Sequence, residues 1–123
     1  MIHSYFSKLK AVLNASPIVE RYKVKKEIVG SFVGQIILEI TLNDGSILHG
    51  FEYVVVSKRK IVREKYRYHW MSENDFIRRW DNAPHHRVIE TFPFHIHTKS
   101  EILPSKEVRL EDILKSIERI RLP

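Results

Sequence analysis

The chain contains no cysteine among its 123 residues. This absence excludes disulfides, thiolate nucleophiles and cysteine-based zinc sites. Glycine is scarce as well, and the four glycines form neither of the glycine-rich loops that bind nucleotide phosphates. No serine lies in the GxSxG motif of serine hydrolases. Nucleotide-dependent phosphoryl transfer and serine hydrolysis are therefore poor explanations of this sequence.

Long apolar runs are also missing. No segment approaches the roughly 20 apolar residues of a membrane-spanning helix. The first ten residues lack the basic and apolar regions of a secretion signal, so we expect a cytoplasmic protein that does not enter a membrane. With 43% hydrophobic residues, the segment 1–123 is expected to form a single domain. The single glutamine, Gln35, and the many charged residues resemble thermophilic compositions.

Two amphipathic helices are predicted, one near each end of the chain. Apolar residues recur at helical spacing from Ile2 to Leu13 and from Leu110 to Ile120. Between them, alternating apolar and polar residues predict strands at about 18–28, 35–42, 47–56, 61–70, 76–80 and 94–97. The Asp44-Gly45 pair predicts a tight hairpin turn. We therefore expect an α+β fold, an antiparallel meandering β-sheet with one face packed on the N-terminal and C-terminal helices.

The positive charge is concentrated in one predicted strand. The net charge is +6, and Lys58–Arg67 alone holds six cations and one glutamate. Strand alternation puts basic and aromatic residues on opposite faces. The basic face is expected to comprise Arg63, Lys65, Arg67 and His69, and the other face Val62, Tyr66, Tyr68 and Trp70. The basic stripe fits a nucleic acid, an acidic protein partner, or a solvated sheet face without a ligand.

Histidine is unusually frequent, with seven residues. Five of them lie in the second half: His69, His85, His86, His95 and His97. One hypothesis is metal-independent RNA cleavage, in which histidines act as acid and base on a substrate that carries its own 2′-OH nucleophile. Its candidate catalytic residues are His69, His85, His97 and Asp81, the last orienting a histidine. Its candidate phosphate-binding residues are Arg63, Lys65, Arg67 and Arg79. Tyr66, Tyr68 and Trp80 could stack on unpaired bases only if their strand face is open.

A metal site is the second hypothesis for the histidines. His95 and His97 are two positions apart on a predicted strand, so they project from the same side. Asp81, His85 or His86 could complete a three-ligand site for a divalent transition metal. The third hypothesis is structural, because a buried histidine often only hydrogen-bonds the backbone. We favour that role for His3 and His49.

Three sequence blocks in this region resemble the TumE-like proteins, small prokaryotic toxins of type II toxin–antitoxin pairs that are often archaeal. The blocks are YRYHW at 66–70, RWDNAPHH at 79–86 and FPFHIH at 92–97. The resemblance is specific in the second half of the chain and general in the first. It implies a toxin-like role and a cognate antitoxin. The family often has a histidine where Phe94 stands here, so a catalytic residue at that position would be missing.

The leading hypothesis is thus a toxin-like endoribonuclease that needs no cofactor, with an antitoxin and RNA as partners and a homodimer left open. The alternatives are a metal-dependent hydrolase, with a metal held by His86, His95 and His97, and a non-enzymatic module. The module would bind a nucleic acid or an acidic protein through Lys58–Arg67.

Overall fold

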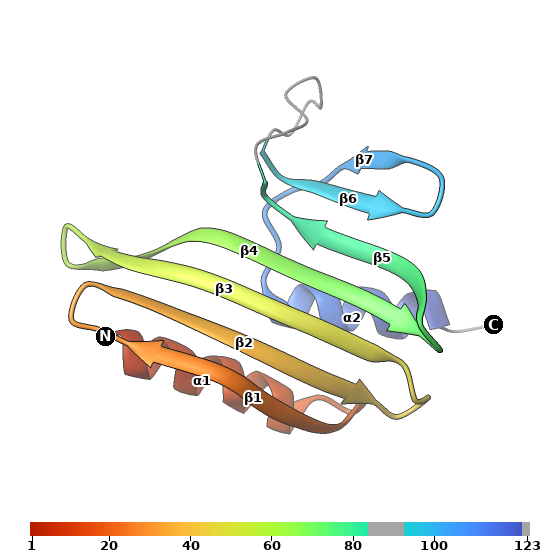
Figure 1. The fold of residues 1–123 in the computed structure, drawn as a ribbon, viewed down its shortest axis with the longest axis horizontal. Coiled ribbons are helices and arrows are strands. Elements are labelled where there is room, and N and C mark those ends of the chain that lie inside the picture. Colours follow the sequence, from red (N-terminus) through yellow and green to blue (C-terminus); the bar gives the residue numbers. More distant parts are fainter. Residues whose placement is uncertain (84–92, 122–123) are drawn as a thin grey trace.

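A computed structural model describes residues 1–83 and 93–121 of the chain. The elements are α1 (Ile2–Ala15), β1 (Val19–Val29), β2 (Val33–Leu42), β3 (Ile47–Ser57), β4 (Lys60–Ser72), β5 (Asp75–Asp81), β6 (His95–Thr98), β7 (Ile102–Pro104) and α2 (Leu110–Arg121). The described strands form one sheet in the order β1 to β7, and each pairs antiparallel with the next (Figure 1). The predicted α+β meander with two flanking helices is confirmed. The short strand β7 was not predicted.

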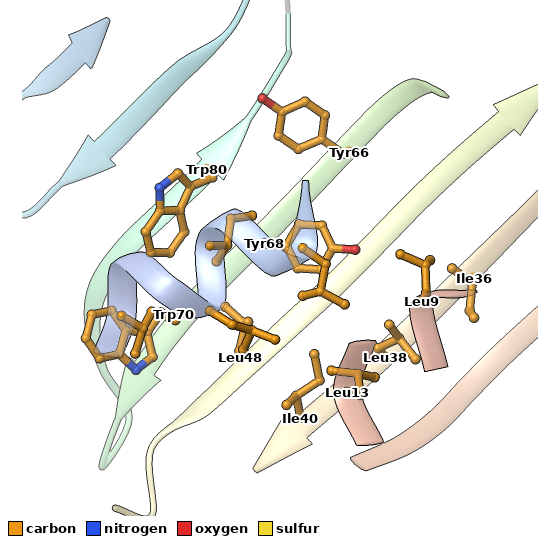
Figure 2. Packing of buried hydrophobic residues seen from close by; sticks show 14 of the residues in the cluster. Leu9, Leu13, Ile36, Leu38, Ile40, Leu48, Tyr66, Tyr68, Trp70 and Trp80 are labelled. Carbon is orange, nitrogen blue, oxygen red and sulfur yellow. The ribbon is translucent and has the colours of Figure 1, made fainter. Parts of the chain in front are cut away.

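Both helices cover the same face of the sheet, behind the strands in Figure 1. Their apolar stripes meet the inward side chains of β2, β3 and β4 in one buried cluster (Figure 2). The helices contribute Ile2, Phe6, Leu9, Leu13, Leu110, Ile113, Leu114 and Ile117. In the described ranges, neither helix is long and apolar enough to cross a membrane. No helix within residues 1–83 and 93–121 covers the opposite face of the sheet, and we call it the open face.

The strand β4 contains a bulge that changes which of its side chains face outward, so the predicted basic face differs from the observed one. The register of β4 against β3 shifts between Arg63 and Lys65, so Glu64 is an extra residue without a partner. Passing an extra residue reverses the alternation of faces. Arg63 is consequently buried, whereas Val62 is 43% exposed. The prediction that Arg63 lies on the exposed basic face is wrong, and its buried guanidinium is out of reach of a phosphate.

Arg63 instead completes a buried polar network beneath the sheet. Its Nη1 lies 3.3 Å from Oε2 of Glu52, and its Nη2 donates to the carbonyl oxygen of Val108 at 2.6 Å. The hydroxyl groups of Tyr5 and Tyr68 both donate to the Glu52 carboxylate. Burial and the negative charge of Glu52 raise the pKa of both hydroxyls, so they stay protonated and act as donors. The network joins α1, β3, β4 and the segment before α2.

Candidate functional site

Asp81, His95 and His97 converge on the open face where β5 pairs with β6. Asp81 lies opposite His95 in the antiparallel register. Its Oδ1 is 2.7 Å from Nε2 of His95, and its Oδ2 is 3.5 Å from Nε2 of His97. All three side chains are largely buried, with 4%, 2% and 14% of their surface exposed. The pair His95 and His97 projects from one side of a strand, as their spacing predicts.

The backbone fixes the orientation of the His95 ring. Its Nδ1 lies 2.8 Å from the carbonyl oxygen of Pro93, an atom that can only accept a hydrogen bond. Nδ1 therefore carries a hydrogen, and Nε2 faces the Asp81 carboxylate. A contact of 2.7 Å between these two atoms needs a hydrogen or a cation between them. The geometry thus suits either a hydrogen-bonded acid–base pair or a metal site.

Arg79 and the following backbone also bind Asp81. The Nε of Arg79 donates to Oδ2 at 2.8 Å, and the backbone N–H of Ala83 donates to Oδ1 at 3.0 Å. The Asn82 side chain holds the chain after Asp81, because it accepts from the backbone of Tyr66 and donates to the carbonyl of residue 64, both at 2.9 Å. Asp81 therefore caps a turn through Oδ1 and also contacts both histidines, the residues it was predicted to orient.

A row of basic residues, His69, Arg79 and His97, crosses the open face and shares His97 with this cluster. His69 pairs with Arg79 across β4 and β5, and Arg79 pairs with His97 across β5 and β6. Neighbouring strands lie about 4.8 Å apart, so the two histidines occupy the positions on either side of Arg79, with backbones roughly 10 Å apart. Partial burial and the nearby charges of Arg79, His49 and Arg67 lower the pKa of His69 below 6.5. His69 is therefore mainly neutral at pH 7.

A cleft of about 730 Å³ opens next to these residues. Its lining includes Lys65, Arg67, Arg79 and Asp81, together with Phe51 from β3. Arg79 and Asp81 thus link the cleft to the histidines, none of which, among the described residues, lines the cleft itself. A separate apolar hollow of about 540 Å³ between α1 and α2 contains none of the predicted site residues. Three of the four predicted phosphate-binding residues therefore share one cleft, and Arg63 is the exception.

The remaining predicted residues separate into three groups. His3 and His49 are exposed, so the prediction that they are buried structural histidines is wrong. His85 and His86 lie outside the described residues, so their candidate roles stay predictions. Tyr66, Tyr68 and Trp80 are core residues, each at most 2% exposed, and cannot stack on bases. Phe51 and Tyr53 on β3 do point to the open face, as does Phe76 on β5, whose ring contacts that of His69. The sequence alone did not single out Phe51 and Tyr53. In the β3–β4 register Phe51 and Tyr53 oppose Arg67 and Lys65, a placement that the sequence alone does not give.

The fold and site together define a small α+β protein with a basic cleft beside a buried histidine–aspartate cluster. The chain belongs to the TumE family: the family model described as toxin TumE matches residues 8–121. The match confirms the resemblance and extends it over the first half of the chain. Searches of curated proteins and of solved structures found no significant match. Family membership indicates a toxin-like protein and suggests an antitoxin as its partner.

Proposed function

We propose that this toxin-family protein cleaves RNA by metal-independent acid–base catalysis on the open face of its sheet. The observation that carries the proposal is the row His69–Arg79–His97, next to a cleft lined by cations. RNA supplies its own nucleophile, so the protein needs only a base, an acid and groups that stabilise the phosphate charge. The row and the cleft contain a candidate for each role.

In the proposed reaction, neutral His69 takes the proton of a 2′-OH. The 2′-oxygen attacks the adjacent phosphorus, and the bond from phosphorus to the 5′-oxygen breaks. His97 donates a proton to the leaving 5′-oxygen, and the products are a 2′,3′-cyclic phosphate and a 5′-hydroxyl. Arg79 and Arg67 stabilise the extra negative charge on phosphorus through charge-assisted hydrogen bonds.

Asp81 and His95 serve as positioning residues in this scheme. The Asp81 carboxylate lies 3.5 Å from Nε2 of His97, where it provides the negative charge that accompanies a protonated ring. His95 is too deeply buried to meet a substrate, at 2% exposure, and it holds the carboxylate from the other side. Arg79 already balances the charge of Asp81, which favours chemistry without a metal cation at this carboxylate.

The test is cleavage of single-stranded RNA by purified protein in EDTA. The wild type should cleave, and His69→Ala and His97→Ala should each lower the rate by about 100-fold or more. His3→Ala is the matched control, because this exposed histidine lies on α1, on the other side of the sheet. Intact RNA in EDTA, together with unchanged growth inhibition by the His69→Ala toxin, would overturn the proposal and favour a non-enzymatic binding module.

A metal-dependent enzyme is the second candidate, and one observation favours it. The ligand atoms of Asp81, His95 and His97 all lie within 4.8 Å of one another, as two histidines and a carboxylate around a transition metal would. The hydrogen bond from Nδ1 of His95 to a carbonyl is also typical of metal-bound histidine. Elemental analysis decides: one zinc or iron per chain, lost in both His95→Ala and His97→Ala, would replace the metal-independent proposal.

A further inference from the structure

Two aromatic side chains of β3 lie on the open face instead of in the core. Phe51 and Tyr53 alternate with Gly50, Glu52 and Val54, which are all buried on the helix-covered face. Neither ring belongs to the buried cluster or to the partly buried residues that pack against it. Both rings are partly exposed. Burial in the core therefore does not account for these two aromatic side chains.

Each ring has a cation beside it on β4. Phe51 pairs with Arg67, and Tyr53 pairs with Lys65. The Nζ of Lys65 lies 5.9 Å from the centre of the Tyr53 ring. Phe51, Lys65 and Arg67 line the same cleft as Arg79. Two successive ring–cation pairs thus lead along the sheet to the proposed catalytic row.

We propose that Phe51 and Tyr53 form a stacking platform for two unpaired bases of a single-stranded RNA. A base that stacks on Phe51 places its phosphate near Arg67, and a base on Tyr53 places its phosphate near Lys65. Positions two apart on a strand are separated by about 7 Å, which gives each base its own ring. The platform selects single strands, because bases in a duplex are already stacked on one another and their faces are hidden.

The alternation of rings and cations favours a nucleic acid over a protein ligand for this surface. Aromatic rings interleaved with cations bind bases and phosphates at once, as in other sheet-based single-strand sites. Two carboxylates line the cleft, Glu64 and Asp81, against the three cations Lys65, Arg67 and Arg79. Asp81 is already bound by Arg79 and by the histidines, so the cleft lining keeps a net positive charge. The inference rests on the proposed function, because it names the RNA class that the site receives.

The experiment measures binding separately from cleavage. A fluorescent single-stranded RNA with a 2′-O-methyl group on every sugar cannot be cleaved through its 2′-oxygen, and fluorescence anisotropy at fixed salt gives its Kd. Phe51→Leu and Tyr53→Leu should each weaken binding roughly tenfold, the typical loss of one base–aromatic stack. Leucine keeps apolar volume, so the fold is preserved, and circular dichroism checks it. Tyr53→Phe keeps the ring and should bind like the wild type.

Phe32→Leu is the matched control, because this ring is 71% exposed and lies in the β1–β2 turn, away from the cleft. Its Kd should not change, and a fully paired duplex of the same sequence should not compete. Wild-type affinity in both Phe51→Leu and Tyr53→Leu would overturn the platform, even in a protein that cleaves RNA. Weakened binding by a protein that cleaves no RNA would support the platform and defeat the nuclease proposal.

Discussion

Asp81 and His95 form the closest contact in the site, with 2.7 Å between Oδ1 and Nε2 and their backbones paired across β5 and β6. The sheet register sets this contact, so the pair is preorganised before any substrate binds. Arg79 and His97 bind the other carboxylate oxygen. One buried carboxylate therefore positions two histidines and one guanidinium at the edge of the cleft.

Asp81→Asn should keep the fold and lower catalysis. The amide can still accept from the backbone N–H of Ala83, but it carries no charge to hold His95, His97 and Arg79. We expect kcat to fall by about 100-fold or more, with KM nearly unchanged, because the residue acts through its neighbours. Steady-state kinetics on a single-stranded RNA measures the two constants. A kcat at the wild-type level would show that Asp81 only caps its turn.

The rate should depend on pH through His69. Its pKa is lowered from 6.5, first by burial and then by the charges of Arg79, His49 and Arg67. A base works when neutral, so kcat/KM should stay high as pH falls to 6.5 and decline only below it. A decline centred above pH 6.5 would contradict the role of His69 as the base.

The variant Arg79→Met tests whether the charge of Arg79 lowers the pKa of His69. Removing the positive charge should move the pKa of His69 up toward 6.5, in the direction opposite to the effect of Arg79. NMR titration of the His69 ring reports this shift without relying on activity. The ring of His3, on α1, provides a reference resonance in the same spectra. An unchanged His69 titration would show that Arg79 does not influence the ring.

Replacing Arg63 should lower the free energy of unfolding, whereas replacing Arg67 should leave it nearly unchanged. Arg63→Ala leaves Glu52 buried without its cation, so the free energy of unfolding should fall by about 3 kcal/mol or more. Arg67 is exposed, so Arg67→Ala should leave stability within about 0.5 kcal/mol of the wild type. Urea denaturation compares the two variants. Equal stability of both would contradict the buried network.

The slope of log affinity for RNA against log salt concentration should report the number of phosphate contacts. Arg67→Ala removes one proposed contact, so the slope of log affinity against log salt should become shallower by about 0.7. Lys23→Ala on β1 is the control, because Lys23 pairs with β2 at the far edge of the sheet and should not alter the slope. A slope unchanged by Arg67→Ala would remove Arg67 from the interface.

The sequence was sufficient to predict the meander and the two helices, because periodicity and turn residues are local signals. It failed at β4, where the bulge at Glu64 reverses the faces and moves Arg63 into the core. No local feature of the strand marks that extra residue. The inward Glu52 also reverses the usual pattern on β3, since a carboxylate occupies the core face while Phe51 points outward.

The site was predicted in its components but not in its arrangement. His95 and His97 share a side because of their spacing, which the sequence shows. Their contact with Asp81 depends on the register between β5 and β6, which pairs residues across a long connection. The position of Arg79 between His69 and His97 likewise depends on the register of β5 against β4 and β6. Register is a property of the folded sheet, so these partners could be proposed from the sequence but not placed.

The chemical nature of the RNA ends tests the central claim most directly. Cleavage by the RNA's own 2′-oxygen must leave a 2′,3′-cyclic phosphate and a 5′-hydroxyl, and mass spectrometry of the fragments made in EDTA should find both. An RNA with a single 2′-deoxy sugar at the cleavage position should remain intact there. Fragments with a 3′-hydroxyl and a 5′-phosphate, formed only when a metal is added, would contradict the account and identify Asp81, His95 and His97 as metal ligands.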